Sequence, residues 1–162
     1  MQSTPTILFK RLKDLNIKIQ THTHPPVFTV NEARIHCGHI EGCHCKNLFL
    51  KDKKNIIYLI VAKDTRLINL KELRKKIGSS HLSFGKPGLL LEVLGVKPGS
   101  VSPLALINDT KKLTTVILDK EMMQECLLNF HPLTNCLTTS ITPRDLLTFV
   151  KNTGHLPELI EL

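Results

Sequence analysis

A segment rich in glycine and proline is the part of this chain whose residue types best suit binding of an anion or a carbonyl group. Within Gly95–Asp109, four such residues fall in nine positions: Gly95, Pro98, Gly99 and Pro103. Glycine reaches backbone conformations closed to other residues and proline fixes its own, so the segment can direct its backbone N–H groups outward as a cradle. The alternative is an ordinary turn, which is what glycine and proline clusters usually form.

Three cysteines and three histidines within ten residues raise two further chemical possibilities. They are His36, Cys37, His39, Cys43, His44 and Cys45. Structural zinc usually takes two well-separated ligand pairs, whereas the spacing here is Cys-x5-Cys-x-Cys with no second paired cluster, so we expect no metal. Cys45 could instead be a nucleophile activated by His44 or Lys46. A half-buried, inert thiol is the simpler interpretation, and the odd count of 5 cysteines does not favour a disulfide framework.

Composition indicates a soluble globular chain. Its 162 residues are 41% hydrophobic and 22% charged, which predicts a single domain, residues 1–162, with a proper core. No apolar run approaches the roughly 18 residues that span a bilayer, and the N-terminus lacks the pattern of a signal peptide. We therefore expect a cytoplasmic protein without membrane contact.

The excess of positive over negative charge lies entirely in the first half of the chain. Residues 1–81 carry 15 Lys and Arg against 6 Asp and Glu, whereas residues 82–162 carry 7 against 8. A basic half favours a polyanionic partner such as nucleic acid, although a generic basic surface would look the same. Low aromatic content, 4% with no Trp, argues against a module that stacks several exposed bases.

The elements that must position these residues form no regular βαβ alternation. Capping residues and apolar spacing predict helices at about 5–16, 30–37, 70–77, 87–94 and 143–153, with a short helix capped by Asp119. Alternating or continuous apolar runs predict strands at 17–22, 47–50, 56–62, 82–84, 104–107, 114–118 and 127–130. This pattern predicts an α+β fold, with a mixed, mainly antiparallel sheet surrounded by helices.

Four motifs together resemble those of one family. They are Lys46–Lys53, Gly95–Pro103, Asn108-Asp109 and Asn129–Asn135. In this order and spacing the chain is similar to the prolyl-tRNA editing family, the YbaK/ProX type of trans-acting aminoacyl-tRNA deacylases, over nearly its whole length. It is most similar to the branch that clears alanine from tRNA for proline, rather than the cysteine-clearing branch. The resemblance implies a mixed sheet wrapped by helices, a tRNA substrate, and neither metal nor other cofactor.

The resemblance also implies roles for single residues. The family's lysine before a strand corresponds to Lys46, and its Gly-x-x-x-Pro loop to Gly99, Ser100, Val101, Ser102 and Pro103. Asn47 and His131 are implied as active-site residues, with His131 lining the amino-acid pocket, and Asn108 as a substrate-binding residue. The implied partners are the acceptor stem and 3′ end of tRNA(Pro), and prolyl-tRNA synthetase. The run Cys43-His44-Cys45 matches none of the family's motifs.

Hydrolysis of an aminoacyl ester needs a placed water and donors for the developing oxyanion more than a strong nucleophile. The Gly99–Ser102 N–H groups could be those donors, the substrate's neighbouring ribose hydroxyl could assist the water, and Lys46 suits the terminal phosphate. A Ser/His/Asp triad of Ser100 or Ser102, His131 and Asp109 is the competing mechanism. The cradle is favoured because neither serine lies in a Gly-x-Ser-x-Gly elbow.

The expected function is deacylation of mischarged tRNA(Pro), with alanyl-tRNA(Pro) as substrate. Two alternatives stay open at this point. One is a deacylase for tRNA carrying cysteine, serine or threonine, because one methylene in a pocket changes affinity by only about 1–3 kcal/mol. The other is a non-catalytic module of the same fold that binds tRNA or a synthetase.

Overall fold

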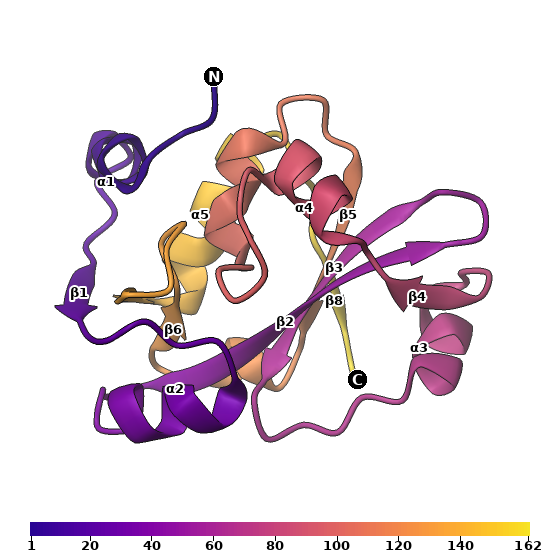
Figure 1. Ribbon diagram of the computed structural model, residues 1–162, viewed down its shortest axis with the longest axis horizontal. Helices are drawn as coiled ribbons and strands as arrows, with labels where there is room; N and C mark the ends of the chain where they lie inside the picture. Colours follow the sequence, from indigo (N-terminus) through magenta and orange to yellow (C-terminus); the bar gives the residue numbers. More distant parts are fainter.

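A mixed sheet of eight strands is the framework of the protein, whose computed structural model describes all of residues 1–162 (Figure 1). Seven strands lie in the order β1-β7-β6-β2-β3-β5-β8, and β4 pairs with β2 off this path. The bounds are β1 Gln20–Thr23, β2 Cys43–Asp52, β3 Ile57–Lys63, β4 Leu82–Phe84, β5 Thr114–Asp119, β6 Leu128–Phe130, β7 Leu137–Ile141 and β8 Glu158–Ile160. Because β2 pairs with β3, β4 and β6, it joins the two halves of the sheet.

Five α-helices and two 3₁₀ helices complete the fold. They are α1 Pro5–Asp14, α2 Val30–Cys37, α3 Leu70–Ile77, α4 Pro87–Leu94, α5 Pro143–Asn152, η1 Pro103–Asn108 and η2 Met122–Gln124. Four α-helices begin where the sequence predicts, because a capping side chain accepts an N–H of the first turn. These capping residues are Thr4, Thr29, Asn69 and Thr142. The predicted end of α4 at Gly95 is also confirmed, since this glycine takes the left-handed conformation at φ 65°.

The sheet is mixed rather than mainly antiparallel, which corrects that part of the expectation. Four pairings are antiparallel, and three, β2–β6, β3–β5 and β5–β8, are parallel. Parallel neighbours need a long crossover connection, and the chain between β3 and β5 runs through α3, β4, α4 and η1. Local sequence patterns predict those elements without showing which strands they join.

Helices cover both faces of the sheet. Alternate side chains of β3 enter two different cores, Ile57, Leu59 and Val61 on one face and Tyr58 and Ile60 on the other. The first core also holds buried side chains of α1, α4, α5 and η1, and the second holds Leu73 of α3. A third, small cluster of Val27, Cys37 and Ile40 fixes α2, which lies across the first part of β2 in Figure 1.

Several predicted elements are wrong in type or extent. Leu104–Ile107, expected to be a strand, lies in η1, because the Ser102 side chain accepts the N–H of Leu104 and Pro103 favours a helical start. Asp119 caps no helix and instead ends β5, and η2 follows Glu121. The strand expected at 17–22 is β1, three residues later at its start.

Two strands were not predicted, and one begins earlier than expected. β7 and β8 are absent from the sequence prediction. β2 begins at Cys43 rather than at Asn47, so the Cys43-His44-Cys45 run lies in the sheet and not in a connection.

None of the helices is both long enough and apolar enough to cross a membrane.

Candidate functional site

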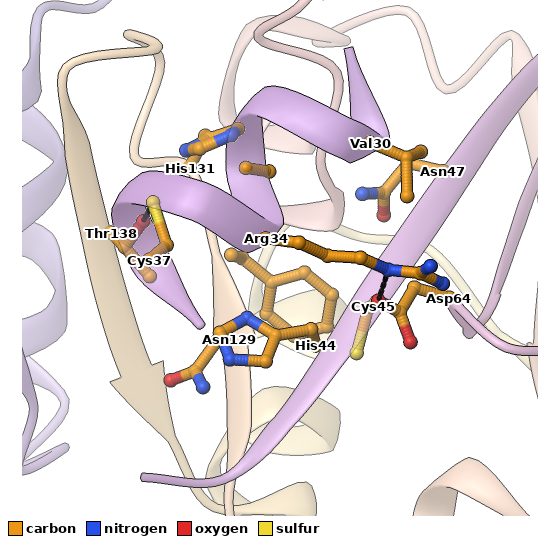
Figure 2. Close-up of a pocket in the computed structure, with 12 residues that line it drawn as sticks. Val30, Arg34, Cys37, His44, Cys45, Asn47, Asp64, Asn129, His131 and Thr138 are labelled. Carbon is orange, nitrogen blue, oxygen red and sulfur yellow. Dashed lines mark hydrogen bonds and ion pairs between the residues drawn. The ribbon is translucent and has the colours of Figure 1, made fainter. Parts of the chain in front are cut away.

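A pocket of about 70 Å³ lies between α2 and the strands β2, β6 and β7 (Figure 2). Its lining residues are Val30, Ala33, Arg34, Cys37, His44, Cys45, Asn47, Asp64, Asn129, Phe130, His131 and Thr138. A single water needs roughly 10–15 Å³ of such space. The pocket therefore has room for a small group only.

His131, which follows β6, presents a neutral imidazole to this pocket. Its Nδ1 lies 2.8 Å from the carbonyl oxygen of Leu137, and because a carbonyl only accepts, Nδ1 carries the proton. Burial lowers the pKa of His131; the bond to Leu137 raises it, while His24 and His44 lower it further. In the neutral ring Nε2 carries a lone pair, and it makes no hydrogen bond within the protein.

A chain of hydrogen bonds connects His24, β7 and α2 on one wall of the pocket. His24 Nε2 lies 2.8 Å from Thr138 Oγ1, and this hydroxyl also lies 3.8 Å from Cys37 Sγ. The rings of His24 and His131 are 5.9 Å apart. Burial raises the pKa of Cys37, against the opposing hydrogen bond from Thr138. Cys37 is therefore a packed thiol rather than a nucleophile.

The Cys43-His44-Cys45 run forms part of the pocket wall without forming a metal-binding cluster. The hydrogen bond with Cys45 lowers the pKa of Cys43, against burial, but Cys43 does not line the pocket. The hydrogen bond with Cys43, together with burial, raises the pKa of Cys45 well above its ordinary value. A thiol held protonated is a poor nucleophile, so the activated-cysteine interpretation is not supported. No three His, Cys, Asp or Glu side chains lie in an arrangement that could hold a metal ion.

Two polar atoms of β2 are buried at the pocket without a protein partner. They are His44 Nε2 and Asn47 Oδ1. The neighbouring amide of Asn129 is already engaged, because it donates to Glu41 O and accepts from Ser140. Buried polar atoms are usually paired, so unpaired ones at a pocket mark a place where a ligand or water binds.

Lys46 and Asn47 are adjacent in β2 but lie on opposite faces of the strand. Asn47 lines the pocket, whereas Lys46 does not. The Lys46 ammonium donates to the carbonyl of Arg66. Burial lowers its pKa, Asp64 raises it and Arg66 lowers it.

The Gly99–Pro103 loop contacts the pocket through His131 without lining it. The Ser102 hydroxyl donates to the backbone oxygen of His131 at 2.8 Å. Of the N–H groups from Gly99 to Ser102, only that of Ser100 has a protein acceptor, the carbonyl of Lys97. The N–H groups of Gly99, Val101 and Ser102 have no protein acceptor, and Gly99 takes the left-handed conformation at φ 92°.

A wider groove of about 370 Å³ runs along this loop. It is lined by Ser100 of the loop, by Lys97 just before the loop and by Phe28, which precedes α2. Val30, two residues after Phe28, lines the smaller pocket. The entry to α2 thus contributes to both depressions, which places the groove next to the pocket.

The structure does not bring Asn108 to the pocket. Its side chain accepts from Ser3 N–H at 2.7 Å and donates to Leu94 O at 3.0 Å. Both ends of the amide are therefore used to hold the N-terminus and the end of α4.

The residues of the competing triad are not assembled either. Asp109 lies 3.0 Å from Nε2 of His155, and both side chains are buried. Burial alone would raise the pKa of Asp109, but hydrogen bonds from His155, Leu113 and Thr114 lower it to about 2. His131 directs Nδ1 to Leu137 rather than to a carboxylate. A Ser/His/Asp relay is thus excluded, because Asp109 is bound to His155 and His131 to Leu137.

The mouth of the pocket carries an ion pair that sequence reasoning missed. Arg34 of α2 lies 3.7 Å from the carboxylate of Asp64, which follows β3, and Figure 2 shows the Arg34 side chain extending from the helix towards Asp64. Thr138 was missed because β7 was not predicted. Asp64 could have been found from the sequence, because it is a polar residue directly after a buried strand.

Comparison with known proteins gives a consistent result. Residues 24–149 match the family model described as "Aminoacyl-tRNA editing domain". "Prolyl-tRNA synthetase associated domain-containing protein 1" of Danio rerio is 42% identical over 151 residues, 92% of this chain and 82% of that protein. "Prolyl-tRNA editing protein ProX" of Acetoanaerobium sticklandii is 35% identical over 154 residues, 94% of this chain and 93% of that protein.

The same architecture is found among solved structures. A candidate trans-editing enzyme for prolyl tRNA synthetase superposes with a TM-score of 0.71, over 100% of this chain and 99% of the other. Their sequence identity is 20%, so this likeness concerns the fold alone.

Proposed function

The chain belongs to the family of aminoacyl-tRNA editing domains and is related to prolyl-tRNA editing proteins, and from this premise we propose that it hydrolyses the aminoacyl ester of mischarged tRNA(Pro), with alanyl-tRNA(Pro) as preferred substrate. The observation that carries the proposal is the pocket of about 70 Å³ with His131 on its wall. A pocket of this size suits a side chain as small as that of alanine.

His131 is proposed to position the attacking water. Because Nδ1 donates to Leu137 O, Nε2 of the neutral ring accepts a hydrogen bond from water. The water oxygen bonds to the ester carbonyl carbon, the bond from that carbon to the ribose oxygen breaks, and the ribose oxygen receives a proton. Free amino acid and tRNA are the products, and the adjacent ribose hydroxyl assists the proton transfer.

The Gly99–Ser102 backbone is proposed to stabilise the oxyanion. The N–H groups of Gly99, Val101 and Ser102 have no protein acceptor, and the Ser102 hydroxyl ties the loop to His131. The ester carbonyl lies outside the amino-acid pocket, where the amino acid joins the ribose, and this is where loop donors are required. Loss of one such donor typically lowers the rate about 100-fold or more.

Lys46 is proposed to contribute to binding of the tRNA 3′ end. Its ammonium must leave the carbonyl of Arg66 to reach a phosphate. Lys46→Ala is therefore expected to lower kcat/KM for an aminoacylated tRNA. Wild-type values of kcat/KM for that variant would exclude Lys46 as an anchor.

The acceptor stem is proposed to lie along the basic first half of the chain. Exposed lysines follow β2 at Lys53 and Lys54, and the exposed face of α3 carries Lys71, Arg74 and Lys75. Such charges neutralise phosphates without reading sequence. Docking on prolyl-tRNA synthetase is a further proposed partnership, prompted by the name of the Danio rerio relative.

A deacylation assay tests the proposed function directly. Purified protein is mixed with tRNA(Pro) charged in turn with alanine, cysteine, serine and proline, and loss of ester is followed over time. We expect fastest turnover of alanyl-tRNA(Pro) and none of prolyl-tRNA(Pro). Faster turnover of the cysteinyl or seryl ester would change the substrate, and tRNA binding without turnover would identify a binding module instead.

A further inference from the structure

Arg34 is the cation at the mouth of the pocket, and its guanidinium is largely free. Its side chain is 58% exposed, and its one ion pair, from Nε to Asp64, is long at 3.7 Å. Neither terminal nitrogen of the guanidinium donates to the protein. Arg34 can therefore present two parallel N–H groups to an incoming anion, which is the geometry that binds phosphate oxygens best.

The other cations around this end of β3 are already neutralised or engaged. Lys63 is paired with Glu121 and Glu125, and the hydrogen bond to Glu125 raises its pKa, against burial. Arg66 is bound to Asp119 and Glu121, and it also donates to the carbonyl oxygen of Leu162. Lys46 donates to the carbonyl of Arg66 and lies outside the pocket wall. Arg34 thus stands apart as the pocket-lining cation whose terminal N–H donors are free.

An aminoacylated RNA brings a negative charge to the mouth of any pocket that holds its amino acid. The amino acid is esterified to the terminal ribose, and the last phosphodiester group is attached to the 5′ oxygen of that same ribose. With the amino acid inside, this phosphodiester must lie just outside. We propose that Arg34 binds the last phosphodiester group of the RNA, an inference that rests on the proposed function.

Asp64 positions Arg34 before RNA binds. The Asp64 side chain is 17% exposed and belongs to the segment after β3, whereas the Arg34 guanidinium lies at the end of a long, 58% exposed side chain on α2. The Asp64 carboxylate attracts the Arg34 guanidinium and keeps it over the mouth of the pocket. Because the two groups are 3.7 Å apart, the ion pair is weak enough for Arg34 to exchange Asp64 for a phosphate. Asp64 is therefore a positioning residue, and Arg34 the residue that contacts RNA.

The test measures binding of an uncharged RNA, so that it does not depend on hydrolysis. The probe is a stem-loop with the acceptor stem and single-stranded 3′ end of tRNA(Pro), either unmodified or with a neutral methylphosphonate at the last linkage. Dissociation constants are measured by fluorescence anisotropy for wild type, Arg34→Gln and Lys46→Gln. Arg144→Gln is the matched control, because Arg144 is exposed on α5 and does not line the pocket.

We expect Arg34→Gln to weaken binding of unmodified RNA by about tenfold or more, as for loss of a hydrogen-bonded charge pair. The methylphosphonate should weaken RNA binding by wild type by a similar factor and RNA binding by Arg34→Gln hardly at all. The slope of log affinity against log salt should decrease in magnitude by about 0.7 for Arg34→Gln, the value for one contact to a single strand. Arg144→Gln should retain both the wild-type affinity and the sensitivity to methylphosphonate.

Two results would overturn the inference and are distinguishable from failure of the proposed function. If wild type deacylates tRNA but Arg34→Gln keeps the full methylphosphonate penalty, Arg34 does not contact that phosphate. If Lys46→Gln alone loses the penalty, Lys46 is the contact instead. If wild type neither binds the RNA nor deacylates tRNA, the proposed function itself fails.

Discussion

The hydroxyl of Ser102 donates a 2.8 Å hydrogen bond to the backbone oxygen of His131, and so fixes the glycine-proline loop to the histidine of the pocket. Ser102 is fully buried, and its oxygen also accepts the N–H of Leu104. Ser102→Ala removes both bonds and leaves the buried N–H of Leu104 unpaired, while the His131 oxygen keeps only the N–H of Leu133. We expect the free energy of unfolding to fall by about 1–3 kcal/mol, measured by urea denaturation.

Ser100→Ala is the matched control for this change. Ser100 lies in the same loop and is buried, but its hydroxyl makes no hydrogen bond within the protein. Its replacement should cost about 0.5 kcal/mol or less. Equal losses for the two serines would show that the bond to His131 contributes nothing to stability. Because neither hydroxyl is a proposed nucleophile, a trapped acyl-enzyme on either serine would contradict the cradle mechanism.

The pH dependence of deacylation should report the neutral state of His131. Burial lowers the pKa of His131, with the Leu137 bond opposing this shift, and only the neutral ring offers Nε2 to water. We therefore expect kcat to be constant near neutral pH and to fall only at pH values below about 6.5, the ordinary histidine value. His131→Gln should lower kcat by about 100-fold or more and abolish the acid limb.

The exposed His81 provides the control for that profile. His81→Gln should retain the wild-type rate and the same acid limb. An unchanged acid limb in His131→Gln would assign the titration to another group. The lowered pKa of His131 also affects stability. Because the folded protein favours the neutral ring, the stabilisation from His131 is present above about pH 6.5 and is lost as pH falls towards the pKa of His131 in the folded protein.

Gly99→Ala tests whether the loop conformation matters for turnover. Gly99 has φ 92°, which side chains rarely adopt, whereas an added Cβ would lie at an ordinary 3.5 Å from Val27 O. The substitution should cost about 1–3 kcal/mol in strain and lower kcat about 100-fold if the loop N–H groups move. Gly78→Ala is the control, since Gly78 has φ 67° and open space around it but lies at the end of α3. It should be strained yet retain activity.

Local chemistry explains why much of the fold could be predicted. Helix starts at Thr29 and Asn69 are set by capping bonds within four residues, and such signals are visible in sequence. The sequence predicts a strand where η1 lies, because Leu104, Ala105 and Leu106 form a short apolar run. All three side chains are buried, and a short buried apolar run can be either a helix or a strand. β8 has only three residues and pairs with β5, where Leu118 lies opposite Leu159, 41 positions further along the chain, so no local pattern could reveal it.

The candidate site was predicted only where a motif carried it. Asn47 and His131, for which the resemblance implies active-site roles, both line the pocket, and those roles stay predictions. Arg34 and Asp64 belong to no motif, and their ion pair depends on how α2 packs over β2, a tertiary relationship that single residues do not encode. Likewise Asp109, which the sequence allowed in a triad, is bound to His155 from beyond α5, a contact between residues 46 positions apart.

The buried Asp109 and His155 pair should make the protein sensitive to acid. The pKa of Asp109 is lowered to about 2 from 3.8, a difference of about 1.8, which corresponds to about 2 kcal/mol of stability. Because the pKa of Asp109 is depressed in the folded protein, this contribution is present above about pH 4 and is lost as pH falls towards 2.

Asp109→Asn should lower the free energy of unfolding at neutral pH and reduce the dependence of that free energy on pH between 4 and 2. Urea denaturation across that range measures both effects, and Asp14→Asn is the control, because Asp14 is exposed and forms an ion pair only with Lys10. If wild type and Asp109→Asn lose stability in parallel below pH 4, the carboxylate of Asp109 does not stabilise the fold.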